Sequence, residues 1–218
     1  MRSRPSLHPC AAFSLADALL RPLLRVTLRE RRLKGRLVAQ AAVQPGHRVL
    51  DIGCGTGTLA LMVKKACPGA EVVGLDADPG VLARARRKAS DAGLEVEFRE
   101  GLATAPPFEP ASFDRVVSSL FFHHLRPRDK RLALRRTHEL LRSSGELHVA
   151  DWGTPHGPFM RAAFLAVQLL DGFATTSDSV RGRLPTYMEQ VGFWPVFETG
   201  KERTLYGSLV FHQAFRPY

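Results

Sequence analysis

Three glycines at alternate positions, the first of them two residues after an acid, have the clearest chemical use in this chain. Gly53, Gly55 and Gly57 follow the apolar run of residues 49–52, which contains Asp51. Glycine permits positive φ angles, and a helix that begins at such a turn directs backbone N–H groups at a ligand. The carboxylate of Asp51 would repel a phosphate, whereas a cationic or hydroxyl-bearing ligand tolerates or uses it. The turn therefore predicts a ligand site other than a simple phosphate cradle.

A second pair of acids follows the next predicted strand. Asp76 ends the apolar run 72–75, and Asp78 directly precedes Pro79. A carboxylate can accept hydrogen bonds from both hydroxyls of a ribose. An Asp followed by Pro is typical of a helix N-terminus. We therefore assign Asp76 to ribose binding and Asp78 to helix capping.

The glycine turn and the acid before it resemble motif I of the class I S-adenosylmethionine-dependent methyltransferases. The alternative is a dinucleotide-binding turn, but its spacing is Gly-x-Gly-x-x-Gly, whereas this chain has Gly-x-Gly-x-Gly. The resemblance implies S-adenosylmethionine as cofactor and S-adenosylhomocysteine as its product. The residues expected at the cofactor are Asp51, Gly53, Cys54, Gly55, Gly57, Asp76, Ala77, Leu102, Ala103, Ser118 and Ser119.

The end of the third predicted strand departs from the family pattern. Methyltransferases of this type usually carry an acid there that binds the adenine amino group, and this chain has Leu102 after Gly101. We expect Leu102 to offer a packing surface for the adenine ring, with the backbone N–H of Ala103 as a polar contact.

The segment after the fourth predicted strand carries the candidates for the methyl acceptor. Residues 113–125 resemble motif IV and the following His-His-Leu of small-molecule methyltransferases, including the quinone-methylating group. The resemblance places Ser118 and Ser119 beside the methionine part of the cofactor. His123 and His124 could orient an acceptor or take its proton, or they could instead cap the next turn.

Asp151 and Trp152 end the fifth predicted strand and are expected on the acceptor side. Methyl transfer mainly requires alignment of the nucleophile, the methyl group and sulfur. A general base is needed only when the pKa of the acceptor is high. His123, His124 and Asp151 are therefore candidates for catalysis, and no residue is assigned to it.

Apolar runs typical of strands alternate with helical patterns along most of the chain. The expected strands are residues 47–52, 70–75, 94–98, 113–119 and 146–150, then 194–198 and 204–215. The expected helices are residues 56–66, 79–92, 127–142, 157–170 and 180–191. Such alternation builds a parallel sheet with helices on both faces. We therefore expect an α/β, Rossmann-like doubly wound sheet that is mostly parallel, and the resemblance implies an antiparallel last strand.

The length of 218 residues fits a single domain. Within it we expect an N-terminal helical cover (1–44), a cofactor-binding core (45–152), and lid helices with closing strands (153–218). The chain has three cysteines and no Cys-x-x-Cys pair, which argues against a disulfide framework or a metal site and for a reducing compartment. The sequence shows no signal peptide and no apolar run long enough to span a membrane. These features favour a cytoplasmic protein.

The chain is strongly basic, with a net charge of +10 and a pI of about 10.2. Such a charge indicates an anionic partner, either nucleic acid or an acidic membrane surface, or only a compositional bias towards arginine. Five arginines recur at three- and four-residue steps and would form one stripe on a helix: Arg21, Arg25, Arg29, Arg32 and Arg36. A basic amphipathic helix can lie on an anionic membrane or present a solvated face.

Three functions are consistent with these features. The first is methyl transfer to a small hydrophobic acceptor, such as a quinone, lipid or natural product. The N-terminal segment with the arginine stripe and the apolar segment 159–170 would then form a lid over an apolar pocket near Phe121, Phe122 and Trp152. The second is RNA methylation, which only the charge supports. The third is a cofactor-binding protein without catalysis. The sequence leaves the oligomeric state open.

Overall fold

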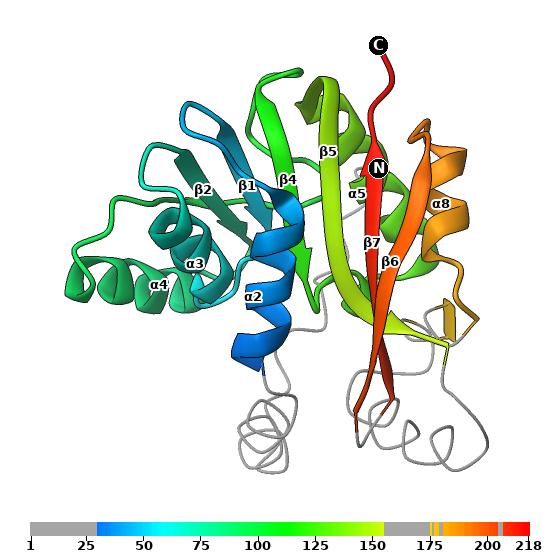
Figure 1. The fold of residues 1–218 in the computed structure, drawn as a ribbon, viewed down its shortest axis with the longest axis horizontal. Helices are drawn as coiled ribbons and strands as arrows, with labels where there is room; N and C mark the ends of the chain where they lie inside the picture. Colours follow the sequence, from blue (N-terminus) through cyan, green and yellow to red (C-terminus); the bar gives the residue numbers. More distant parts are fainter. Residues whose placement is uncertain (1–29, 155–174, 176, 179–180, 205–206) are drawn as a thin grey trace, which may run out of the picture.

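A seven-stranded sheet with helices on both faces forms the molecule (Figure 1). The structure is a computed structural model, and it describes residues 30–154, 175, 177–178, 181–204 and 207–218. The strands are β1 (Arg48–Ile52), β2 (Glu71–Asp76), β3 (Glu97–Glu100), β4 (Phe113–Ser119), β5 (Leu141–Gly153), β6 (Val196–Arg203) and β7 (Ser208–Phe215). The helices are α2 (Glu30–Ala41), α3 (Thr58–Ala66), α4 (Pro79–Asp91), the short η1 (Phe122–His124), α5 (Pro127–Leu140) and α8 (Leu184–Gln190).

The strand order β3-β2-β1-β4-β5-β7-β6 confirms the expected doubly wound topology. Strands β1 to β5 pair in parallel, and β7 pairs antiparallel with both β5 and β6. The antiparallel last strand that the resemblance implied is therefore present. Reversal of the strand order between β1 and β4 creates the switch point at which ligands bind in open α/β sheets.

Successive buried residues of the central strands pack into two separate apolar cores, one on each face of the sheet. Val49 on β1 packs with α2, α3 and α4 on one face of the sheet, whereas its neighbour Leu50 packs with α5 and α8 on the other. Both side chains are fully buried. This pattern is expected where both faces of a sheet are covered, because successive side chains point to opposite faces.

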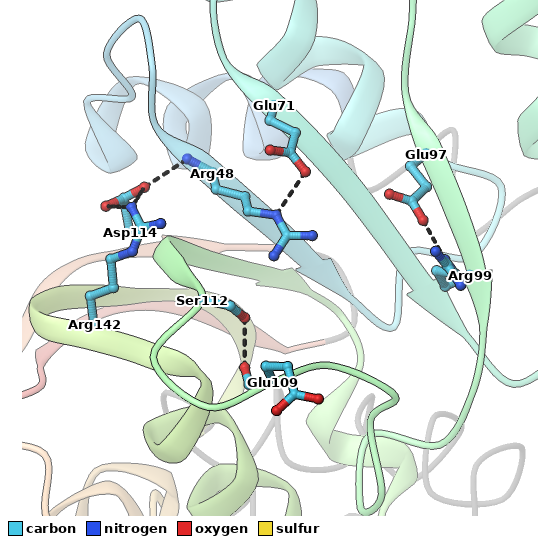
Figure 2. Close-up of polar contacts among 8 residues, drawn as sticks. All are labelled: Arg48, Glu71, Glu97, Arg99, Glu109, Ser112, Asp114 and Arg142. Atoms are coloured by element: carbon cyan, nitrogen blue, oxygen red, sulfur yellow. Dashed lines mark hydrogen bonds and ion pairs between the residues drawn. The ribbon is translucent and has the colours of Figure 1, made fainter.

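The fifth strand is longer than the sequence indicated. Helix α5 ends at Leu140, and β5 begins at once instead of at residue 146. Asp114 explains this, because it accepts hydrogen bonds from Arg142 at 2.7 and 2.9 Å and from the backbone N–H of Arg48 at 2.7 Å (Figure 2). Residues 142–145 then bulge out opposite residue 114, with Ser144 at a φ of 62°.

The third strand also differs from the expected range. It covers Glu97–Glu100 instead of residues 94–98, since the N–H of Leu94 still closes the end of α4 by bonding to the carbonyl of Ala89 at 3.0 Å. The strand therefore reaches further towards the edge of the sheet at which Asp76 lies.

The terminal parts are described only partly. Helix α2 covers the α3 side of the sheet, while residues 1–29 and the expected helix 157–170 lie outside the described residues. The division into cover, core and lid remains a prediction. Among the helices of the described ranges, none combines the length and apolar character needed to cross a membrane.

Candidate cofactor and acceptor site

The carboxyl ends of the parallel strands meet at one edge of the sheet. In the register of the sheet, Asp76 lies opposite Glu100, and Ser119 lies opposite Ala150. The turn after β1 and the segment after β4 flank the switch point between these two strands. The structure thus brings the predicted cofactor residues and the predicted acceptor residues to neighbouring strand ends.

Each glycine of the turn has a positive φ, of 70° at Gly53, 53° at Gly55 and 71° at Gly57. A Cβ at Gly53 would lie 2.2 Å from the ring of Phe121, and one at Gly57 would lie 2.8 Å from the ring of Phe98. A Cβ at Gly55 would meet nothing within 4 Å. Packing therefore requires two of the glycines, while the third leaves open space beside the backbone where a ligand can approach.

Asp76 ties the glycine turn to the end of β2. Its Oδ2 accepts a hydrogen bond from the N–H of Gly55 at 2.8 Å, and its Oδ1 accepts one from the N–H of Asp78 at 3.1 Å. The side chain is half-buried, and a carboxylate that has accepted two hydrogen bonds retains further acceptor capacity. The capping role predicted for Asp78 is confirmed, since its Oδ1 accepts from Gly80 at 2.7 Å and from Val81 at 3.3 Å.

Asp51 faces the core and not the open side of the turn. Its side chain is 1 % exposed, and Oδ2 accepts from the N–H of Ala60 in α3 at 3.0 Å. Burial raises the pKa of Asp51 to about 7, although Lys34 and the Ala60 N–H lower it in part. The carboxyl group therefore positions α3 behind the turn. Cys54 is also buried, and its thiol donates to the carbonyl of Gly55 at 3.7 Å within the turn.

Lys88 is a contributor to the turn that the sequence did not reveal. Its Nζ donates to the hydroxyls of Thr56 at 2.9 Å and Thr58 at 3.0 Å, and so joins α4 to the end of the glycine turn. Lys88 comes to the turn because α3 and α4 lie on the same face of the sheet.

Leu102 lies at the next strand end, as expected of a surface for a flat ring. It is 41 % exposed, and the N–H of the preceding Gly101 bonds to the carbonyl of Asp76 at 3.0 Å. Ala103 is partly buried against the α5-side core, and Ala77 is exposed beside Asp76. A carboxylate, an open glycine and an exposed apolar side chain thus lie together, which suits a ligand with neighbouring hydroxyls and a flat ring.

The two serines that end β4 differ in their surroundings. Ser118 is completely buried, and its Oγ donates to the carbonyl of Ile52 at 3.0 Å, which fastens β4 to β1. Ser119 is half-buried at the strand end. Of the two side chains, the structure therefore leaves Ser119 as the candidate for a cofactor contact.

His123 and Asp151 form a buried pair. The Nδ1 of His123 lies 2.6 Å from Asp151 Oδ1, and the backbone N–H of His123 donates to Oδ2 at 3.1 Å. Burial raises the pKa of Asp151, but the ring of His123 and the N–H of Trp152 lower it by more, so the carboxyl group has a pKa below its usual value. His124 is exposed, and its ring centroid lies 3.9 Å from that of His123.

Two of the three aromatic residues expected around an acceptor belong to the cores. Phe122 is 1 % exposed and packs on the α5 side of the sheet, while Trp152 is 5 % exposed and packs on the α2 side. Phe121 is half-buried against Gly53 and remains at the strand ends. Phe122 and Trp152 therefore pack in the two cores, which agrees with the packing alternative for Trp152, and an acceptor pocket near them stays a prediction.

Sequence reasoning missed a buried charged network centred on helix α5. Lys130 on α5 is 2 % exposed, and its Nζ donates to the carbonyl of Thr175 at 2.8 Å and lies 4.0 Å from Asp178 Oδ2. The hydroxyl of Tyr187 donates to the same Asp178 oxygen at 3.0 Å. The sequence did contain one indication that Lys130 is buried, since it shares the i, i+3, i+4 stripe of α5 with the apolar residues Ala133 and Leu134.

The arginine stripe is described only from Arg32 onward. Arg36 is partly exposed, and its guanidinium stacks 4.3 Å from the ring centroid of Phe211 and donates to the carbonyl of Thr199 at 3.1 Å. Arg32 is exposed, whereas Arg21, Arg25, Arg29 and the apolar segment 159–170 lie outside the described residues. Within the described part of the chain, no cluster of His, Cys, Asp or Glu is suited to hold a metal ion.

The comparisons with known proteins identify methyltransferases as similar to this chain. Residues 49–145 match the family described as "Methyltransferase domain". The demethylmenaquinone methyltransferase of Thermus thermophilus is 43 % identical over 124 residues, which cover 57 % of this chain and 56 % of that protein. The chain spans about half the length of the curated relatives it matches.

Solved structures share the fold. The YcgJ protein from Bacillus subtilis aligns with a TM-score of 0.72 and 19 % identity, over 86 % of this chain and 99 % of its own. The S-adenosylmethionine-dependent methyltransferase SibL aligns with a TM-score of 0.70 and 24 % identity, over 95 % of this chain and 60 % of its own. In sequence over residues 49–145 and in fold, the chain is therefore similar to S-adenosylmethionine-dependent methyltransferases.

Proposed function

We propose that the protein transfers a methyl group from S-adenosylmethionine to a small hydrophobic acceptor of the quinone type. The observation that carries the proposal is the contact of Phe121 with Gly53, which holds the segment leading to His123 directly against the glycine turn. Cofactor and acceptor groups would meet there. The similarity to a protein named demethylmenaquinone methyltransferase supports the acceptor class.

The residues of the turn would hold the cofactor by complementary chemistry. Asp76 would accept hydrogen bonds from the ribose hydroxyls, since its oxygens retain acceptor capacity beside Gly55. The exposed side chain of Leu102 would pack against the adenine ring. The bound cofactor supplies an electrophilic methyl group on a sulfonium sulfur.

The histidine pair would act on the acceptor. Asp151 accepts from Nδ1 of His123, so the neutral ring keeps its basic lone pair on Nε2. An acceptor hydroxyl could then give its proton to Nε2 as it attacks the methyl group. The exposed His124 would contact and orient the acceptor. Burial of both members of the pair excludes water from the proton-holding groups.

A methylation assay with labelled S-adenosylmethionine tests the proposal. Prenylated naphthoquinol, phospholipid extract and total RNA are offered separately to the wild-type protein and to the variants Asp76→Ala and Asp78→Ala. We expect label in the quinol with wild type and Asp78→Ala, and far less with Asp76→Ala. Label confined to RNA would establish the second candidate function, and cofactor binding without any transfer would establish the third.

We also propose a cytoplasmic protein that contacts an anionic membrane holding its acceptor. The net charge of +10 supports this contact, at about 1 kcal/mol for each basic residue near the surface. Liposome sedimentation with anionic and neutral vesicles tests it at low and high salt. Arg21→Gln with Arg25→Gln should weaken binding more than the matched control Arg84→Gln with Arg87→Gln. Equal loss in the two variants would show that only net charge matters.

A further inference from the structure

The outer side of helix α5 carries an excess of positive charge. Between residues 126 and 136 the chain has six basic residues and a single acid, Asp129. Lys130 is buried, whereas the other five basic residues are exposed. These five are Arg126, Arg128, Arg131, Arg135 and Arg136. The positive charge of this segment therefore lies almost entirely on the surface.

A general excess of arginine does not account for this charge. Residues 84–100 run from α4 to β3, and they hold five basic residues but also four acids. Helix α4 packs in the core on one face of the sheet, whereas α5 packs with α8 in the core on the other face. Basic residues are thus nearly balanced by acids on the α4 face and are left in excess on the α5 face.

The contacts of these arginines leave most of their charge unpaired. Arg136 pairs with Glu139 at 2.7 Å, and the guanidinium of Arg131 lies 5.2 Å from the ring centroid of Tyr187. Within the described part of the chain, no ion pair joins Arg128 or Arg135 to an acid. These guanidinium groups are therefore available to an anionic surface.

Helical geometry places the arginines on one side of α5. Arg128, Arg131 and Arg135 recur at three- and four-residue steps, so they share a face of the helix. Leu132 follows Arg128 by four residues and therefore lies on the same face, where it is 36 % exposed. A leucine among arginines matches a lipid surface, which has charged headgroups outside and hydrocarbon beneath, better than the charged backbone of a nucleic acid.

The turn before α8 brings further positive charge to the edge of the sheet where the parallel strands end. Arg181 and Arg183 are exposed on either side of Gly182. A Cβ at Gly182 would lie 2.8 Å from the hydroxyl oxygen of Thr154, which directly follows β5. The two arginines therefore flank the carboxyl end of β5.

Polar contacts join this turn to α5. The N–H of Arg183 bonds to the carbonyl of Asp178 at 3.0 Å, and the carboxylate of Asp178 lies 4.0 Å from Nζ of Lys130. Helix α5 itself begins at Pro127, shortly after η1 with the exposed His124. The arginines of α5 and of the turn thus form one surface beside the predicted acceptor groups.

We propose that this surface docks the protein on an anionic lipid membrane. It is called the basic face below, and it consists of Arg128, Arg131, Leu132, Arg135, Arg181 and Arg183. The inference rests on the proposed function for its purpose, because docking would bring the strand ends beside a bilayer that dissolves an apolar acceptor. It assigns the contact to α5 and the turn before α8, which are separate from the N-terminal arginines.

Vesicle sedimentation without cofactor or acceptor tests the basic face. The variant Arg128→Gln with Arg131→Gln and Arg135→Gln removes three charges from it. The matched control Lys65→Gln with Arg84→Gln and Arg87→Gln removes three exposed charges from α3 and α4. A basic residue near an anionic surface strengthens binding about fivefold, so the first variant should bind phosphatidylglycerol vesicles about 100-fold more weakly than wild type. The control should lose far less, and phosphatidylcholine vesicles should bind neither protein.

Tryptophan fluorescence tests whether the basic face itself touches lipid. Leu132→Trp places a reporter on α5, and Ala83→Trp places one at an exposed position of α4 as the control. Both are made with Trp194→Phe, since Trp194 is 67 % exposed and would add its own signal. With phosphatidylglycerol vesicles, emission of the α5 reporter should shift to shorter wavelength and be quenched by brominated lipid. Emission of the α4 reporter should stay unchanged.

These outcomes separate the inference from the proposed function. Equal binding of the first variant and wild type, or equal losses in the two charge variants, overturns the inference. An unshifted α5 reporter overturns it as well, and this readout decides if the first charge variant does not fold. Loss of binding to total RNA in the first variant, with vesicle binding intact, would assign the face to nucleic acid instead. The expected binding and fluorescence results support the inference even if no methyl transfer is found.

Discussion

Replacement of Asp76 by alanine gives the sharpest test of the cofactor site. The side chain accepts from Gly55 at 2.8 Å and from Asp78 at 3.1 Å, and in the proposed complex it also accepts from the ribose. A hydrogen bond to a charged group contributes about 1.5–3 kcal/mol. Loss of one such bond therefore predicts a rise in Kd of about 10- to 150-fold.

Titration calorimetry with S-adenosylhomocysteine measures the change without turnover. Asp78→Ala is the matched control, since it removes an acid two residues away that caps α4. That variant should lose about 1 kcal/mol of folding free energy and keep its affinity. Asp76→Asn, which can still accept from Gly55, should fall between wild type and Asp76→Ala. An unchanged Kd in Asp76→Ala would remove Asp76 from ribose binding and refute the reasoning.

Three further predictions use the same region. Leu102→Asp should tighten S-adenosylhomocysteine binding by about 0.5–1.5 kcal/mol in calorimetry, because the added carboxylate can accept a hydrogen bond from the adenine amino group. The leucine side chain is 41 % exposed, so its replacement leaves no cavity in the core. Weaker binding would show that Leu102 does not face the adenine ring. Asp51 has a folded pKa of about 7 against an ordinary value of 3.8, so the native state holds the extra proton and its contribution to stability falls as pH rises through that window. Asp51→Asn should remove this component from denaturation measured at pH 5 and pH 8, and an unaltered slope would contradict it. Gly53→Ala should lower the unfolding free energy more than Gly55→Ala, since a Cβ at Gly53 meets the Phe121 ring at 2.2 Å whereas one at Gly55 meets nothing within 4 Å. Equal losses of unfolding free energy in the two variants would mean that backbone strain alone determines the destabilisation.

Local features of the chain were predictable because they depend on neighbouring residues. The turn at Gly53–Gly57 follows from the need for positive φ, and the cap at Asp78 from an acid placed before Pro79. The alternation of strands and helices, and hence the doubly wound sheet, follows from periodicity. The gathering of the predicted cofactor residues follows in turn, since parallel strands end at a common edge.

Which way a polar side chain faces was decided only by the tertiary structure. Asp51 and Ser118 were read as cofactor residues, yet the first bonds to Ala60 and the second to the carbonyl of Ile52, 66 residues away. Lys130 finds its partner 45 residues along the chain. A sequence pattern gives the face of an element, but the groups opposite that face come from distant segments, and they determine whether a carboxylate, a hydroxyl or an ammonium binds a ligand or the protein itself.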